Sequence, residues 1–286
     1  MIDCLPECVS KRIARSITSA LREELSTYPK PGLVSYEDCG SHPDMCARDF
    51  EKAIIVLEPF FQQMAEDGIS RAPLAVLQRT GLAAEKAMLA ATGQKNTHRG
   101  AIFCLGLFAA AAGLRTQCQR DKTLGAIICE TWGPALPDPR ELSPVSYGIA
   151  ICRQHGIAGV RGEAARGFPA VYRRGLPVWR QALARTTREA AKVQLFFELL
   201  DECEDTTLLK RGGIEGNRLA RSLVNDFLQA GGVFRADWFE QARTIHQRFV
   251  EHNLTAGGAA DLLATTLFVY EMEHGSSLRP SPAVRL

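Results

Sequence analysis

The stretch KPGLVSYEDCGSHPDM, residues 30–45, gathers a lysine, a histidine and a carboxylate in a segment without helical periodicity. Lys30 begins it, and His42 and Asp44 stand two residues apart near its end. Ordering irregular backbone costs conformational entropy, so such a segment needs partners elsewhere in the fold. These side-chain types suit anion binding, proton transfer and metal binding.

A second polar group precedes an apolar helix predicted over residues 98–115. In GQKNTHRG the side chains of Lys95, His98 and Arg99 lie beside its first turn, where free N–H groups and the helix dipole favour a phosphate. The alternative is that Asn96 or Thr97 only caps the helix and the basic side chains are solvated, which is the commoner arrangement.

The segment DECEDTTLLKRGG, residues 201–213, offers acids and an arginine. Asp201 and Asp205 are four residues apart, so on one helix their carboxylates share a face and could hold Mg²⁺. Arg211 with Gly212 and Gly213 could approach phosphate oxygens closely. The alternative is a solvated acidic helix end with a glycine C-cap.

Three further carboxylates stand in helical or loop contexts. Asp261 follows the turn formed by Gly257 and Gly258 and lies in an otherwise apolar helix, as either a structural cap or a metal and substrate ligand. Glu163 lies among the glycines of residues 159–171, predicted to be a flexible polar loop. Glu85 lies on an alanine-rich helix, where a solvated position is the default.

The elements that must position these residues are predicted to be helices. Apolar residues recur every four positions at Ile13, Ile17, Leu21 and Leu25, and no sustained strand-type alternation occurs. Further helices are predicted over 73–92, 98–115, 143–155, 178–203, 217–230, 235–252 and 258–272. Glycine and proline punctuate between them. The chain is therefore expected to be one all-α domain over residues 1–286, a multi-helix bundle whose glycine-rich loops converge on a polar cavity.

Composition excludes several classes of protein. The 286 residues carry a formal net charge of +2, too small to indicate a nucleic-acid surface. The nine cysteines form no CxxC pair, and the longest apolar run, residues 101–114, is short for a membrane span. The N-terminus lacks the basic, apolar pattern of a signal sequence. A cytoplasmic protein that binds neither nucleic acid nor membrane is expected.

Five stretches in order resemble the motifs of the triphosphoribosyl-dephospho-coenzyme A synthases, which serve citrate lyase and malonate decarboxylase. They are KPGLVSYEDCGSHPDM, NTHRGAIFCLGLFAAA, GEAARGFPAV, EDTTLLKRGG and GGAADLLATTLF. The resemblance runs from about residue 28 to residue 270, and YPKPGLVS with GSHPDM is closer to the malonate decarboxylase branch. The sequence departs from the family pattern at Gln94-Lys95, Thr207, Lys210 and TAGG, residues 255–258.

The resemblance implies transfer of the triphosphoribosyl group of ATP to the ribose 2′-hydroxyl of 3′-dephospho-CoA. Adenine is released, and the product is the prosthetic-group precursor of an acyl carrier protein. Mg²⁺ and a homodimer are expected with it. Carboxylates would stabilise the positive charge that develops on the ribose, and a base would take the hydroxyl proton.

On that basis each candidate residue receives an expected role. Lys30, Arg99 and Arg211 would bind phosphates, while Asn96 and His98 would orient the substrate. His42, Asp44, Asp205 and Asp261 would lie at the ribose or a metal ion, the metal ligands being Asp44, Asp205 and Asp261. Glu85 and Glu163 are candidates for the general base. Four glycines would let the nucleotide approach the backbone closely: Gly212, Gly213, Gly257 and Gly258.

Other functions compete with this interpretation. A Mg²⁺-dependent helical hydrolase of nucleotides or phosphate esters is the main alternative, although such enzymes use an adjacent His-Asp pair and Pro43 separates His42 from Asp44. A prenyl-transferring enzyme would show a DDxxD run, which the sequence lacks. A non-catalytic scaffold for the acyl carrier protein would release no adenine.

Overall fold

The computed structural model describes residues 6–118, 121–143 and 146–275. Within these ranges the chain forms twelve α-helices and no strand, which confirms the all-α prediction. The helices are α1 (Pro6–Ser26), α2 (Ala47–Ile69), α3 (Leu74–Ala91), α4 (Arg99–Cys118), α5 (Leu124–Thr131), α6 (Tyr147–His155), α7 (Gly159–Ala165), α8 (Leu176–Leu183), α9 (Arg188–Glu202), α10 (Thr206–Gln229), α11 (Trp238–Glu251) and α12 (Gly257–His274). Shorter helical turns occupy Gly133–Ala135, Ala170–Gly175 and Gly232–Phe234.

Two predicted segments differ from the structure. The single helix predicted over 178–203 is divided into α8 and α9, because the Thr187 side chain accepts a hydrogen bond from the Ala190 N–H and starts a new helix there. The segment 159–171, predicted to be a flexible loop, forms α7 and enters the π-helical turn Ala170–Gly175. Local glycine content suggested a loop, but tertiary packing stabilises a helix.

The start of α10 is also earlier than predicted. Asp205 caps it and the helix runs from Thr206, whereas the apolar pattern predicted a start at residue 217. Gly213, with φ of 59° and ψ of −158°, kinks the helix about two turns after its start. Since Asp201 belongs to α9, the prediction that Asp201 and Asp205 share one helix face is wrong.

The core is built around α4 and α12, which are apolar on all sides and therefore lie inside. Gly68 of α2 and Gly113 of α4 let these two helices touch, because a Cβ at either position would lie within 2.0 Å of a carbonyl oxygen of the other helix. By length and composition the window Arg99–Gln117 could cross a membrane, but 72% of it is buried in this fold. This degree of burial is typical of a helix in the core of a folded domain, so α4 is interpreted as a core helix.

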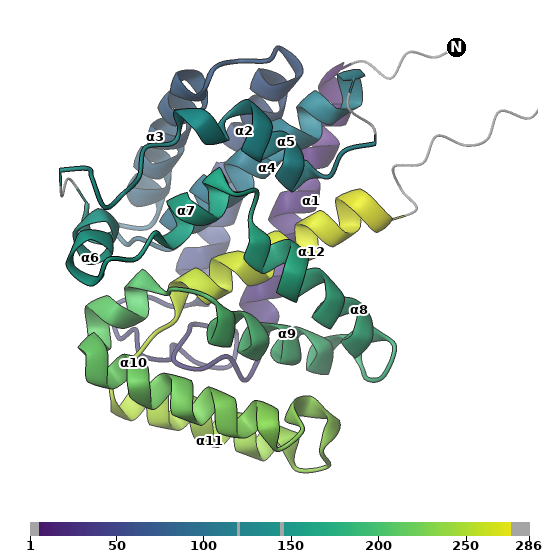
Figure 1. Cartoon of the computed structure of the whole chain (residues 1–286). Helices are drawn as coiled ribbons and strands as arrows, with labels where there is room; N and C mark the ends of the chain where they lie inside the picture. The colour runs from purple at the N-terminus through teal and green to yellow at the C-terminus, as the bar shows by residue number, and fades with distance from the viewer. Residues whose placement is uncertain (1–5, 119–120, 144–145, 276–286) are drawn as a thin grey trace, which may run out of the picture.

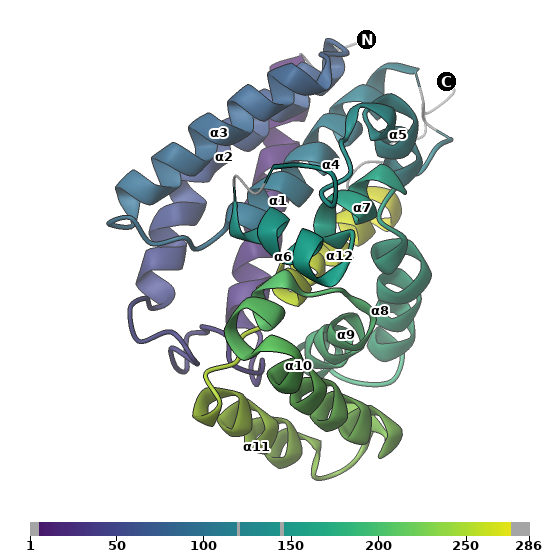
Figure 2. The same ribbon diagram turned by 60° about the vertical axis from the view of Figure 1, so that its left-hand side comes forward.

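The arrangement brings distant segments to one place. α12 runs through the middle of the molecule beside α1 and α4, and α10 and α11 lie at one end (Figures 1 and 2). The irregular segment that follows α1 lies between α11 and the rest of the bundle. The end of α1, the beginnings of α4 and α12, and this segment therefore meet.

Candidate active site

A pocket of about 140 Å³ opens where these four segments meet. Its lining includes apolar side chains together with two carboxylates, two cations and two histidines. Its polar and glycine lining is formed by Glu24, Lys30, His42, Asn96, Thr97, His98, Arg99, Gly100, Thr207, Thr255, Gly257 and Asp261. Seven of the residues predicted to form a site thus face one cavity.

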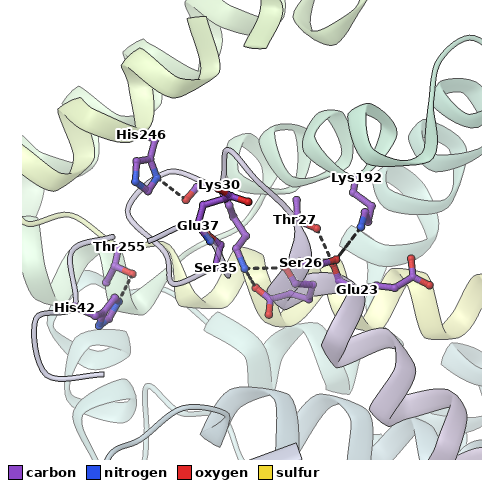
Figure 3. A network of polar contacts seen from close by, with 11 residues as sticks. Glu23, Ser26, Thr27, Lys30, Ser35, Glu37, His42, Lys192, His246 and Thr255 are labelled. Atoms are coloured by element: carbon purple, nitrogen blue, oxygen red, sulfur yellow. Dashed lines mark hydrogen bonds and ion pairs between the residues drawn. The ribbon is translucent and has the colours of Figure 1, made fainter. Parts of the chain in front are cut away.

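Hydrogen bonds from distant helices order the irregular segment 30–45. The His246 ring contacts the Lys30 carbonyl oxygen at 3.1 Å (Figure 3). It also lies 3.2 Å from the Asp38 carboxylate. The Ser41 hydroxyl donates to the Phe249 carbonyl oxygen at 3.3 Å. The partners expected for this costly irregular backbone are therefore supplied by α11.

The tautomer of His42 follows from its two neighbours. Arg211 Nη2 lies 3.1 Å from Nδ1, and because a guanidinium only donates, Nδ1 accepts. Nε2 then carries the proton and donates to the Thr255 hydroxyl at 2.9 Å (Figure 3). Burial, with Arg211 adding, lowers the pKa of His42 to about 4. Both nitrogens are engaged, so this geometry makes His42 an orienting group and not a free base.

Glu24 and Lys30 form a buried ion pair at the base of the pocket. Lys30 Nζ contacts Glu24 Oε1 and also donates to the Glu24 carbonyl oxygen at 2.9 Å. Figure 3 shows the Lys30 side chain beside the end of α1. The side chains are 1% and 7% exposed for Lys30 and Glu24. Burial raises the pKa of Glu24 and lowers that of Lys30, and the attraction within the pair opposes both shifts.

Asp261 lies against the first turn of α4. The Ala101 N–H donates to its carboxylate, and a Cβ on Gly100 would lie 1.9 Å from Oδ2, so only glycine fits there. Asn96 Oδ1 accepts from the Arg99 N–H at 3.1 Å. Two N–H groups of the helix end predicted to bind phosphate are thus bonded to Asn96 and Asp261, which cap it. The alternative of solvated basic side chains does not describe His98, which is buried. Burial, with the charges of Glu24 and Asp205, raises the pKa of Asp261 well above its ordinary value.

His98 offers an unsatisfied nitrogen to the pocket. The residue is 3% exposed, Nδ1 lies 3.0 Å from the Thr97 hydroxyl, and the ring packs edge-on against Phe50. Nε2 has no hydrogen-bond partner within the described part of the chain. Buried polar nitrogens are nearly always paired, so this one indicates a place for a ligand atom.

The buried His98 makes a testable contribution to the pH dependence of stability. Burial, with Lys30 adding, lowers its pKa to about 3 from the ordinary 6.5. Because the folded-state pKa is depressed, the stability that the neutral ring contributes is complete above pH about 6.5 and is lost as the pH falls toward 3. We expect wild type to lose up to about 1.4 kcal/mol per pH unit more than His98→Gln between pH 6 and 4, measured by urea unfolding. Parallel slopes for the two proteins would contradict this.

Asp205 does not line the pocket but lies directly behind it. Its Oδ1 accepts from the N–H groups of Thr207 and Leu208 at 2.8 and 3.0 Å, and Oδ2 accepts from Ala259 at 3.0 Å. The Gly258 N–H adds a further bond. Burial raises the pKa of Asp205, and these four backbone donors oppose that shift. The carboxylate therefore fastens α10 to the start of α12.

The Arg211 guanidinium is likewise used within the protein. Besides His42, it donates to the Ser41 carbonyl oxygen at 2.9 Å and to Asn253 Oδ1 at 2.6 Å. Gly212 and Gly213 lie beside it at the kink of α10 and do not line the pocket. Of the other glycine pair, Gly257 lines the pocket and Gly258 bonds to Asp205.

The remaining predicted carboxylates lie outside the pocket. Glu85 forms an ion pair with Arg99 at its rim. Glu163 Oε2 accepts from the Ala170 N–H at 2.9 Å, and Oε1 lies 3.4 Å from Arg166. Burial raises the pKa of Glu163. Asp44 is exposed on the loop, two residues beyond His42.

The three predicted metal ligands are not gathered. Asp261 faces the pocket, Asp205 is bonded behind it and Asp44 is exposed. Among the described residues no group of three acidic, histidine or cysteine side chains is arranged to hold a metal ion. The protein residues alone do not fit a Mg²⁺ site.

Sequence reasoning missed Glu24. A signal was present, because Glu24 comes three residues after Leu21 and seven after Ile17 and so lies on the apolar stripe of α1. An acid on a buried stripe requires a partner, and Lys30 lies only six residues further on. Thr207 and Thr255 also line the pocket without having been predicted.

A pocket lined by two carboxylates, two cations and two histidines in an all-α fold suits an enzyme that acts on a polar, charged small molecule. The chain belongs to the CitG family of ATP:dephospho-CoA triphosphoribosyl transferases, whose model matches residues 10–280. The predicted family and enzyme class are thereby confirmed.

Relatives from several bacteria are similar over most of their length. A probable 2-(5''-triphosphoribosyl)-3'-dephosphocoenzyme-A synthase of Acinetobacter calcoaceticus is 37% identical over 263 residues, covering 90% of this chain and 89% of the relative. The Klebsiella pneumoniae synthase of that name is 32% identical over 283 residues, 93% of each chain. No solved structure matches the chain.

Proposed function

We propose that this protein transfers the triphosphoribosyl group of ATP to the ribose 2′-hydroxyl of 3′-dephospho-CoA and releases adenine. Family membership over nearly the whole chain supports the reaction class. The observation that carries the assignment to this pocket is the convergence of Glu24, Lys30, Arg99 and Asp261 from four separate segments around one cavity. We propose residues 1–286 as one transferase domain.

The charges in the pocket suit glycosyl transfer. Breaking the bond between ribose C1′ and adenine N9 builds positive charge on the sugar, which nearby carboxylates stabilise. We place the ribose beside Asp261 and Glu24, with the triphosphate toward Lys30 and Arg99. His98 Nε2 would contact the substrate, while His42, Arg211 and Asp205 hold the walls in place.

In this proposal Mg²⁺ binds together with the nucleotide and not to the protein alone. Mg²⁺ is commonly held by one or two carboxylates together with substrate phosphates, not by a complete protein cage. Asp261 is the pocket carboxylate available for such a shared position. When bound, the ion would neutralise part of the triphosphate charge.

The wider role also belongs to the proposal. The product would be the prosthetic-group precursor of an acyl carrier protein. The resemblance of YPKPGLVS and GSHPDM, residues 28–35 and 40–45, to the malonate decarboxylase branch favours that pathway over citrate lyase. A cytoplasmic location and a homodimer remain predictions from the sequence.

The decisive experiment is detection of free adenine by chromatography after incubation with ATP, Mg²⁺ and 3′-dephospho-CoA. Adenine should appear in step with acceptor consumption and only with the acceptor present. Adenine without acceptor would indicate hydrolysis at C1′, and inorganic phosphate would indicate a phosphohydrolase.

Arg99→Met should raise the KM for ATP about 10-fold, because one charge-assisted contact to phosphate is lost at the rim. Lys86→Met is the matched control, since Lys86 is an exposed cation on α3 that does not line the pocket. An unchanged KM in Arg99→Met would remove Arg99 from phosphate binding.

A further inference from the structure

Two carboxylates face the pocket within the described part of the chain, and they are Glu24 and Asp261. The other carboxylates predicted from the sequence either form bonds within the protein or lie outside the pocket. Asp205 accepts backbone N–H groups, Glu85 pairs with Arg99, and Glu163 accepts from Ala170. Asp44 is exposed outside the pocket. His98 also offers a free nitrogen, but burial lowers its pKa to about 3, so it is a weak base. The candidates for a base that takes the proton of the incoming hydroxyl are therefore Glu24 and Asp261.

The surroundings of these two carboxylates differ. Burial raises the pKa of Glu24, and the ammonium group of Lys30, which is paired with Oε1, opposes that rise. Glu24 Oε2 makes no hydrogen bond with the described residues. Asp261 has one backbone donor, Ala101, and faces the negative charges of Glu24 and Asp205. The Asp261 carboxylate is thus already bonded to the first turn of α4 and packed against Gly100, whereas Glu24 keeps one oxygen without a partner among the described residues.

The position of Glu24 also fits the task. It lies on the last full turn of α1, a helix held on its buried face by α2 and α12, and its side chain is 7% exposed. Lys30 holds it from the segment that forms the pocket wall, with two contacts to the same residue. A carboxylate fixed in this way keeps one orientation toward the cavity.

An independent observation indicates that the same cavity receives a ligand. His98 Nε2 is buried at the pocket wall and has no partner within the described residues. Lys30 lies close enough to His98 to lower its pKa, so Glu24, Lys30 and His98 surround one small volume. A substrate atom that satisfies His98 therefore lies near Glu24.

We propose that Glu24, oriented by Lys30, is the general base of the transfer, which deepens the proposed function and rests on it. Glu24 takes the proton of the acceptor hydroxyl while that oxygen forms a bond to ribose C1′. The C1′–N9 bond breaks, its electron pair leaves with adenine, and adenine takes one proton from water. Glu24 returns its proton to solvent after the product leaves, so protons and charges balance.

The test is Glu24→Gln, with Glu23→Gln as the matched control. Glu23 is the adjacent acid on α1 and pairs with Arg188 at the surface, outside the pocket. Dephospho-CoA-dependent adenine release should fall about 10²–10⁴-fold in Glu24→Gln and stay within about twofold in Glu23→Gln. Azide, which attacks without losing a proton, should restore adenine release in Glu24→Gln and yield triphosphoribosyl azide.

A second variant separates catalysis from folding. Glu24→Asp keeps the charge beside Lys30 but withdraws the carboxylate by one methylene group. It should retain the wild-type thermal unfolding transition and still lose at least about 10-fold in kcat, with little change in the KM for ATP.

Three results would overturn the assignment. Near-wild-type turnover in Glu24→Gln, or a loss that azide does not restore, shows that Glu24 acts only on structure. Either of these two results leaves the proposed function intact, provided that the wild-type protein releases adenine when 3′-dephospho-CoA is present. Failure of wild type to release adenine overturns the proposed function and this assignment together.

Discussion

Lys30→Met is expected to lower the free energy of unfolding by about 3–5 kcal/mol at pH 7, because it leaves the Glu24 carboxylate buried without its cation. Both side chains are less than one-tenth exposed, so water cannot replace the lost partner. The Glu24 backbone carbonyl also loses its contact with Nζ at 2.9 Å. Activity should be lost as well, since Lys30 lines the pocket.

The pH dependence of this variant has a definite sign. Burial already raises the pKa of Glu24 above its ordinary 4.5, and removal of Lys30 takes away the main opposing attraction. A carboxyl with a raised folded-state pKa contributes most to stability below its unfolded-state pKa, and that contribution is lost as the pH rises through the folded-state pKa. The deficit of Lys30→Met relative to wild type should therefore be small near pH 4 and large at pH 7.

Urea unfolding at several pH values measures this deficit, and two further variants control it. Lys192→Met removes a lysine that is equally buried, but its carboxylate partner, Glu189, is 68% exposed and can be hydrated again. It should cost about 1–2 kcal/mol. The double variant Lys30→Met/Glu24→Gln should recover part of the loss. A deficit in Lys30→Met that is independent of pH would contradict the ion-pair explanation.

The second large effect is expected for Asp205→Ala, with a loss of about 3 kcal/mol of stability. Removal of the carboxylate leaves backbone donors of Thr207, Leu208 and Ala259 without their acceptor in a buried region. Loss of the N-cap of α10 alone accounts for about 1 kcal/mol.

Asp205→Asn separates the capping of α10 by this side chain from its bond to α12. The amide oxygen can still accept from Thr207 and Leu208, whereas the amide nitrogen cannot accept from Ala259. About half of the stability loss is expected, and hydrogen exchange should accelerate at Ala259 while the first turn of α10 stays protected. Asp201→Ala, at the half-buried end of α9, is the control and should remain near wild type. Equal losses for the Asp205 and Asp201 variants would show that the bonds behind the pocket contribute little.

Prediction of the site from sequence was strongest where residue type and context already required a partner. Lys30, His98 and Asp261 are polar residues beside or inside apolar segments, and all three line the pocket. It was weakest for residues whose polar groups are satisfied by the protein itself. Arg211 was expected to bind phosphate, yet its donors hold His42, Ser41 and Asn253.

The sequence by itself determined the helical class, because apolar spacing is a local property that each segment carries alone, as along Ile13, Ile17, Leu21 and Leu25. Only the tertiary structure decided which carboxylates are free for chemistry. Asp205 is satisfied by Ala259, 54 residues away, and Glu24 reaches a cavity shared with the starts of α4 and α12. Such partners are set by packing between distant segments, and no local pattern in the chain records that packing.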